Sequence, residues 1–150
     1  MGVSSQVRDT TSAPRPVAEG LFTWPSERSS LLGSRCPDCG ETTFPAQRGC
    51  PACSSQNCEE LELGRSGTLW TWTVQHFPPP HPWMGDAREF VPFGGGYIEL
   101  ADGVRVESRL TENDPARLRI GMEMELVIET FSENDEGEEV VTFAFRPVEE

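Results

Sequence analysis

Apolar and polar residues alternate along much of the second half of the chain. Over residues 68–75, large apolar or aromatic side chains alternate with threonine, a pattern typical of a strand with one buried face. An Asp102-Gly103 pair, which favours a tight hairpin turn, lies between two further short apolar runs. On these grounds we expect five strands, over residues 68–75, 97–100, 104–110, 123–131 and 140–145.

A break in this pattern separates the third strand from the fourth. Asn113 and Asp114 offer a helix cap there and Pro115 suits a first helical turn, so a short helical turn is predicted. Five strands with a helical element after the third favour a mainly β fold, a five-stranded OB-fold barrel that closes on itself. A β-sandwich is the alternative, because periodicity alone does not distinguish the two.

The first third of the chain has a different organisation. Residues 1–18 mix Ser, Thr, Pro and charged side chains without periodicity, which predicts a disordered tail. In a leader segment over 19–33, apolar residues return on both sides of a polar break at 25–28, which favours two short anchors rather than one helix. These anchors, which include Phe22 and Trp24, either cap the core of the chain or dock on another protein.

Four cysteines carry the clearest chemical signal. Cys36 and Cys39 form one C-P-x-C pair, and Cys50 and Cys53 form a second after a gap of ten residues. Two such pairs supply the tetrahedral sulfur set that Zn²⁺ prefers, and four protein ligands leave no open position for chemistry. We therefore expect one structural zinc ion in a ribbon with rubredoxin-like knuckles over 34–60, followed by the barrel over 61–148.

Other uses of these cysteines remain open. A disulfide framework would suit a secreted chain, but no apolar secretion signal follows the start of this sequence. Iron could occupy the same four thiolates, although a rubredoxin has a much longer stretch between its knuckles. Cys58 is the fifth cysteine, and we assign it no role.

Charge and composition restrict the partners and the chemistry. The 150-residue chain has a formal net charge of −13, which disfavours nucleic acids and anionic membranes because both bind mainly through Lys and Arg. No apolar stretch approaches the roughly 20 residues that span a bilayer, so we expect a cytoplasmic protein. All twelve basic residues are arginine, so Schiff-base and P-loop chemistry, which need lysine, are excluded. His76, His81 and Tyr97 are the remaining proton carriers near neutral pH.

The connection between the first two predicted strands is rich in proline and aromatic residues. Its prolines favour an extended path, and its apolar side chains exceed what a solvent loop normally carries. We interpret it as an interaction arm, with folding over one end of the barrel as the alternative. The apolar side chains concerned are Phe77, Trp83, Met84, Phe90 and Phe93.

Two further features of this region have weaker functional interpretations. His76, His81, Asp86 and Glu89 could form a second metal or acid–base site, but their spacing gives this no support. The Gly94-Gly95-Gly96 run lacks the other parts of a phosphate-binding loop. Before a strand, it more simply permits a bulge or a close approach of backbone at the barrel mouth.

Several motifs occur together in a fixed order. They are the two cysteine knuckles and the segments Leu32-Gly33-Ser34-Arg35-Cys36, Phe44-Pro45, Gly67-Thr68, 100–106 and 120–122. In this order they resemble the zinc-ribbon and OB-fold proteins associated with acyl-CoA enzymes, over about residues 17–147. The resemblance implies a non-catalytic subunit that stabilises a thiolase-like or lipid-transfer-protein-like enzyme and shapes its acyl-CoA entrance.

The resemblance extends to partners and contacts. It is strongest to partners of steroid side-chain retro-aldolases, which implies a heterotetramer with the thiolase-like subunit and leaves room for a separate hydratase subunit. The leader and the aromatic loop would grip the partner. Arg105 and Arg109 would either meet CoA phosphates or serve as solvated surface charge.

Two other functions are alternatives to this one. An OB barrel can bind single-stranded nucleic acid by stacking bases on aromatic rings, here Trp70, Trp72 and Trp83, but the net charge speaks against it. A stand-alone acyl-CoA hydrolase or lyase would use His76 or His81 with Asp86.

Overall fold

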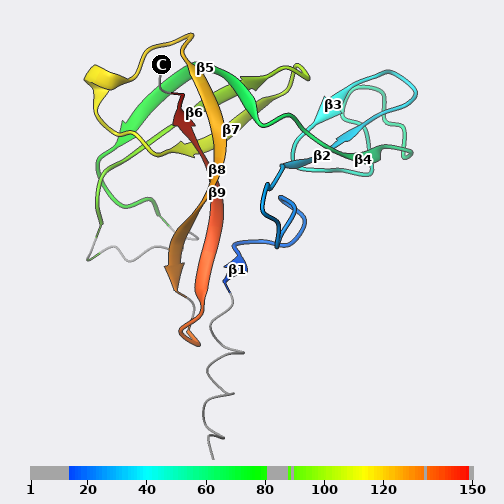
Figure 1. The fold of residues 1–150 in the computed structure, drawn as a ribbon. Coiled ribbons are helices and arrows are strands. Elements are labelled where there is room, and N and C mark those ends of the chain that lie inside the picture. Colours follow the sequence, from blue (N-terminus) through cyan, green and yellow to red (C-terminus); the bar gives the residue numbers. More distant parts are fainter. Residues whose placement is uncertain (1–13, 81–87, 89, 134, 149–150) are drawn as a thin grey trace, which may run out of the picture.

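Two β-sheets make up most of the structure, a computed structural model that describes residues 14–80, 88, 90–133 and 135–148. A small three-stranded sheet has the order β3-β2-β4, and a larger sheet has the order β1-β9-β7-β6-β5-β8 (Figure 1). The small sheet contains β2 Leu32–Arg35, β3 Thr42–Thr43 and β4 Glu59–Glu62. The large sheet contains β1 Arg15–Pro16, β5 Ser66–Gln75, β6 Phe93–Leu100, β7 Arg105–Leu110, β8 Glu123–Glu133 and β9 Glu139–Pro147.

The large sheet closes on itself as a barrel. β8 pairs with both β5 and β9, and β9 pairs in parallel with β7, so the five long strands form a closed ring. A 3₁₀ turn at Pro115–Arg117 lies between β7 and β8, and the Asp114 side chain caps it by accepting from the Ala116 N–H. The predicted five-stranded OB-fold barrel is confirmed, and the β-sandwich alternative is wrong because the sheet closes.

A β-bulge changes the faces of β5. Strict alternation would place Trp70 and Trp72 on the same face, but the register with β6 shifts between Leu69 and Thr71. Leu69 is fully buried and Trp72 packs against the core, whereas Trp70 is 45% exposed. The bulge therefore turns one of the two tryptophans out of the barrel.

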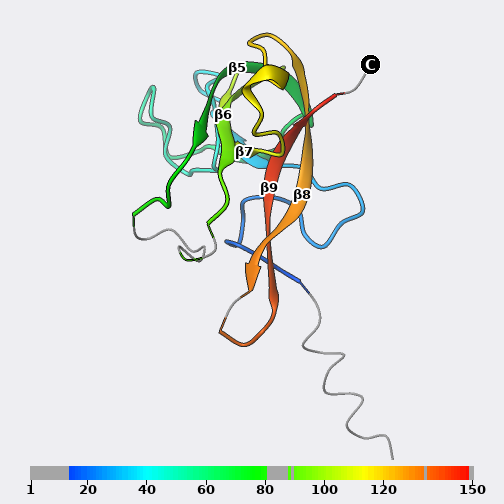
Figure 2. The ribbon, with the colours of Figure 1, turned by 90° about the vertical axis from the view of Figure 1, so that its left-hand side faces the viewer.

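The predicted disordered tail is wrong over its last residues. Arg15 and Pro16 pair in parallel with Val140 and Val141 of β9, and the Val17 N–H donates to the Val141 carbonyl at 2.8 Å. Backbone hydrogen bonds to β9 hold this segment although its sequence has no strand periodicity. Figure 2 shows β8 and β9 extending past the barrel as a long hairpin.

The leader segment packs on the chain's own core. Phe22 forms an isolated antiparallel bridge with Leu31, and both side chains are buried. Leu31 and Leu63 share one hydrophobic cluster with the barrel residues Leu69 and Ile98. Because this cluster runs from the leader into the barrel, the leader and barrel are packed together.

An aromatic contact joins the ribbon to the barrel. Phe143 of β9 meets the edge of Phe22 at 6.5 Å between centroids and the edge of Phe44 at 5.6 Å. Phe44 directly follows β3, so one barrel ring touches both the leader and the ribbon.

Among the described residues, no helix is long and apolar enough to cross a bilayer.

Candidate metal centre and barrel groove

Two backbone knuckles bring the four cysteine sulfurs together. In the first knuckle the Gly40 N–H donates to the Cys36 carbonyl at 2.7 Å, and Gly40 has a φ of 85°. In the second, the Ser54 N–H donates to the Cys50 carbonyl at 2.9 Å. The left-handed conformation at Gly40 is one that glycine adopts without strain.

The sulfur positions fit a tetrahedral metal site. The Cys36 and Cys53 sulfurs lie 3.6 Å apart, the Cys39 and Cys50 sulfurs 3.5 Å apart, and all four lie within 4.8 Å of one another. Tetrahedral zinc with Zn–S bonds of about 2.3 Å would place its sulfurs about 3.8 Å apart. The four predicted ligands are therefore positioned to bind a single metal ion.

Backbone donors favour the thiolate form of one cysteine in each knuckle. Burial alone would raise the pKa of the Cys36 thiol, but the N–H groups of Cys39 and Asp38 donate to its sulfur and lower the pKa from 9.0 to about 6. The N–H of Cys53 likewise lowers the pKa of Cys50. Metal ligation needs thiolates, so these donors prepare the site for a cation.

Cys58 lies beside this site without belonging to it. Burial raises the pKa of the Cys58 thiol, and the neighbouring Cys36 and Cys50 raise it further. Its N–H donates to the Arg48 carbonyl at 3.2 Å. Among the described residues, the group of His, Cys, Asp and Glu side chains that could hold a metal contains the other four cysteines and not Cys58.

A groove of about 580 Å³ lies on the barrel, far in sequence from the metal site. Its lining comes from β5, β6, β7 and β9 and combines aromatic rings with hydroxyl groups and two charges. The lining residues used below are Thr71, Thr73, Phe93, Gly95, Tyr97, Glu107, Arg109 and Thr142.

Arginine side chains stack on aromatic rings around this groove. Arg109 lies over the Phe93 ring at 4.3 Å from its centroid and pairs with Glu129 at 3.5 Å. Arg105 lies over the Trp70 ring at 4.1 Å and pairs with Glu99 at 3.4 Å. Because each guanidinium already has a ring and a carboxylate, neither is a free cation for a phosphate group.

The predicted partner-binding residues have different environments. Phe22 is 4% exposed, so the structure places it in the core and leaves almost none of it for another protein. Trp24 is partly buried, and its indole N–H donates to the Pro14 carbonyl at 3.2 Å. Phe77, by contrast, is 68% exposed. The leader thus caps its own core, which was one of the two interpretations.

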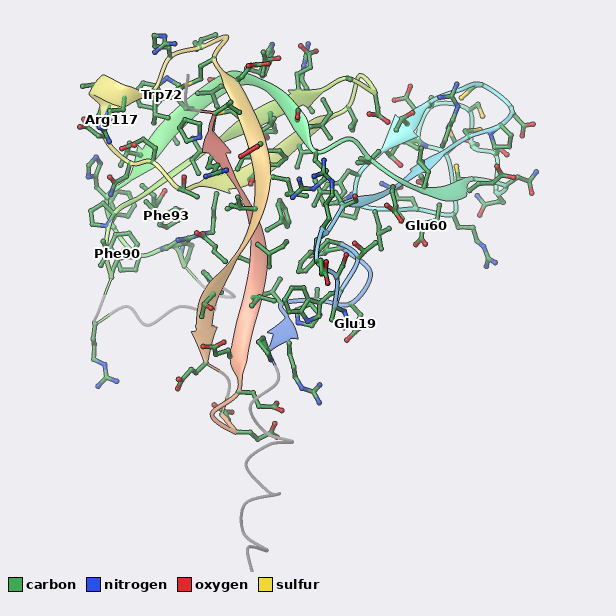
Figure 3. All side chains as sticks on the ribbon, viewed as in Figure 1. Glu19, Glu60, Trp72, Phe90, Phe93 and Arg117 are labelled. Atoms are coloured by element: carbon green, nitrogen blue, oxygen red, sulfur yellow. The ribbon has the colours of Figure 1, made fainter. Side chains whose placement is uncertain are left out.

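The rest of the aromatic loop is described in part. Phe90 and Phe93 meet edge to face at 6.0 Å between centroids, and both lie on one flank of the barrel (Figure 3). Trp83 and Met84 lie outside the described residues, as do His81, Asp86 and Glu89. Of the proposed second site, only His76 lies within the described residues.

Two exposed aromatic residues of the barrel were not predicted as binding residues for an enzyme partner. Trp70 is 45% exposed and Tyr97 is 40% exposed, and their rings meet edge to face at 6.2 Å. With Arg105 stacked on Trp70, they form a three-residue cluster on the outer surface. The alternation in the sequence predicted that Trp70 lies on the buried face of its strand. The bulge in β5 turns its side chain outward instead.

Comparison with known proteins identifies the family. Residues 27–59 match the description "ChsH2, rubredoxin-like zinc ribbon domain", and residues 60–129 match "ChsH2, C-terminal OB-fold domain". A "DUF35 domain-containing scaffold protein" of Methanocaldococcus jannaschii is 32% identical over 125 residues, covering 82% of this chain and 85% of that protein. The chain belongs to the DUF35 family.

Two further similar proteins carry more specific descriptions. The "Benzoylsuccinyl-CoA thiolase subunit BbsA" of Thauera aromatica is 30% identical over 118 residues, covering 79% of this chain and 76% of that subunit. A solved structure described as "Ltp2-ChsH2(DUF35) aldolase" is similar with a TM-score of 0.55 and 26% identity, over 79% of this chain and 84% of that one. The predicted resemblance to zinc-ribbon and OB-fold proteins of acyl-CoA enzymes is confirmed.

Proposed function

We propose that this chain is a non-catalytic subunit that binds and stabilises a thiolase-like enzyme acting on acyl-CoA. The observation that carries the proposal is its similarity, over three quarters or more of the chain, to a scaffold protein, a thiolase subunit and the DUF35 chain of an aldolase. The ribbon and the barrel are both present, and both belong to the matched region.

The chemistry of the described residues supports an accessory role. Four cysteine ligands would fill a tetrahedral metal, so the ion would have no position for substrate or water. The chain has no lysine, two histidines and one tyrosine. The carbon–carbon chemistry is therefore assigned to the partner.

We infer that the metal is one structural zinc ion held by Cys36, Cys39, Cys50 and Cys53. The small sheet contains only four, two and four residues in its three strands. So small a unit gains most of its folding free energy from metal binding. Zinc would supply fixed geometry for the ribbon and no reaction step.

The partner's reaction is the finer part of the proposal. We propose carbon–carbon bond cleavage of an acyl-CoA, with the steroid side-chain retro-aldol reaction as the predicted case and a heterotetramer as the predicted assembly. A separate hydratase subunit stays a prediction. The ion pairs of Arg105 and Arg109 give no support to direct contact with CoA phosphates.

The exposed aromatic residues are the proposed contacts for the partner. Phe77 and the cluster of Trp70, Tyr97 and Arg105 have the residue types that dominate the binding energy of protein interfaces. Of these residues, Tyr97 also lines the groove to which Phe93 contributes. Nucleic acid is a weaker candidate than a protein partner for this surface, because Arg105 and Arg109 already pair with glutamates.

Reconstitution with the thiolase-like protein encoded nearest to this chain tests the proposal. We expect that enzyme to be poorly soluble or inactive alone and to gain retro-aldol or thiolytic activity when this chain is added. Thiolysis without retro-aldol cleavage would correct the reaction and retain the subunit role. An enzyme whose solubility and activity do not change on addition of this chain would refute the proposal.

A further inference from the structure

The three glycines of β6 differ in what requires them. A side chain at Gly94 would place its Cβ 2.3 Å from the Glu112 carbonyl oxygen, and one at Gly96 would meet the Thr71 carbonyl oxygen at 2.4 Å. At Gly95 the nearest atom would be the Ser108 carbonyl oxygen at 3.8 Å, which is ordinary van der Waals contact. Packing of the barrel therefore explains Gly94 and Gly96 and leaves Gly95 unexplained.

Backbone conformation does not require a glycine at this position either. Gly95 lies inside β6, paired with Thr73 on one side and Arg109 on the other, and its φ is not in the left-handed region. Glycine inside a strand is destabilising relative to alanine. A glycine inside a strand often marks a bulge, a bend or a site where a ligand or another backbone approaches closely.

The space above Gly95 is the floor of the groove. Residues two apart on a strand face the same side, so Phe93 and Tyr97 flank Gly95 on the outer face of β6. All three line the groove of about 580 Å³, which is within the usual range for a small-molecule site. The missing side chain thus leaves a notch between two aromatic rings.

The charges around the notch favour an uncharged occupant. Arg109 is paired with Glu129 and covered by Phe93, while Glu107 adds a negative charge to the lining. The whole chain has a net charge of −13, so a phosphate or carboxylate would be repelled. Thr71, Thr73 and Thr142 add uncharged hydrogen-bonding groups to a lining that also contains the rings of Trp72 and Phe143.

We propose that the notch over Gly95 binds the uncharged acyl portion of an acyl thioester. The inference rests on the proposed function, because an acyl-CoA enzyme as partner would bring such a group to this face of the barrel. The phosphate-bearing part of the thioester would lie outside the groove. The exposed Trp70 and Phe77 remain available for the partner protein.

Amide chemical shifts of the zinc-loaded full chain test this with defined probes. The decanoyl thioester of N-acetylcysteamine should shift the amide signals of Gly95, Gly96, Thr73 and Arg109, whereas free coenzyme A should shift none of them. Gly95→Val would fill the notch, and its Cβ fits without displacing backbone. We expect this variant to bind the probe at least about tenfold more weakly.

A matched control distinguishes a filled notch from a general effect of substitution on the barrel. Thr68→Val changes β5 on a residue that does not line this groove, and it should bind the probe like the unchanged chain. Absence of shifts in the four groove amides, equal shifts with free coenzyme A, or unchanged binding by Gly95→Val would each overturn the inference. Complex formation with the thiolase-like enzyme, measured separately for Gly95→Val, distinguishes failure of the acyl site from failure of the proposed function.

Discussion

Single residues with defined steric surroundings set the local shape of the barrel. Gly96 is fixed by backbone, since its Cβ would lie 2.4 Å from the Thr71 carbonyl oxygen, while its neighbour Gly95 has room to 3.8 Å. The same contrast does not exist in the sequence, where the two residues are adjacent and identical. Whether glycine is required at each position therefore depends on how close a carbonyl group of the neighbouring strand lies to it.

Alanine substitutions at these two positions should have opposite effects. Gly96→Ala forces β5 and β6 apart and should lower the free energy of unfolding by about 1–3 kcal/mol. Gly95→Ala should be neutral or raise it by about 0.5 kcal/mol, because alanine has less freedom in the unfolded chain. Denaturant unfolding of both variants measures the difference. Equal destabilisation would contradict the contacts assigned to Gly96.

The five cysteines should separate into ligands and a bystander. Cys36→Ser removes a sulfur from the four-thiolate set and should abolish stoichiometric zinc and the amide-exchange protection of β2 to β4. Cys58→Ser should retain one zinc per chain, because Cys58 lies outside the ligand set. Elemental analysis of the purified variants distinguishes them. Loss of zinc in Cys58→Ser, or its retention in Cys36→Ser, would show that the ligands are misassigned.

At the scale of elements, the alternation of apolar and polar residues predicted strands that have one buried face. The 3₁₀ turn was predicted because Asp114 and Pro115 form a cap. β9 was also predicted, although consecutive residues of it are buried and it has no fully exposed face. β6 was predicted too short, since its first residues include three glycines that carry no alternation signal. The outward position of Trp70 was missed because a bulge depends on the partner strand.

The N-terminal strand β1 was missed for a related reason. Arg15–Pro16 has no periodicity, and its stability comes from backbone pairing with β9 and from the ion pair of Arg15 with Glu138 at 3.1 Å. Similarly, the cysteine spacing predicted the four sulfurs that the structure brings together. The groove was not predicted, because its lining comes from strands far apart in the chain. The local pattern of residue types does not predict contacts between segments that are far apart in the chain.

The attachment of this N-terminal segment can be tested at one hydrogen bond. Val17→Pro removes the N–H that donates to the Val141 carbonyl and should lower the free energy of unfolding by about 1 kcal/mol more than Val17→Ala does. Thermal unfolding of both variants gives the comparison. If proline and alanine have the same effect, the tail is not held on β9 by this bond.

At the scale of the whole molecule, the chain is strongly acidic and has exposed aromatic residues on the barrel. The nearby Arg105 and Arg109 are each paired with a glutamate. Such a surface suits a partner that is recognised by apolar contact rather than by phosphate charge. The ribbon, leader and barrel pack through Phe143 and a shared cluster, so the partner would meet one preassembled unit. This arrangement explains how a chain with little catalytic chemistry can serve a large enzyme.

The exposed Phe77 should matter for assembly and not for folding. Phe77→Ala should leave the free energy of unfolding within about 0.5 kcal/mol and weaken binding of the thiolase-like enzyme about tenfold. Ile120→Ala is the matched control, since Ile120 is 69% exposed and lies in the loop before β8. Calorimetric titration of each variant measures the affinity. Equal losses for both residues would show that Phe77 has no special role.

The most direct measurement is the mass of the species that elutes when this chain and the thiolase-like protein encoded beside it are produced together. Size-exclusion chromatography with light scattering should give one peak that contains both chains in equal amounts, with the mass of a heterotetramer and one zinc per DUF35 chain. Two separate peaks, each with the mass of its own chain, would contradict the central claim that this protein is a subunit of that enzyme.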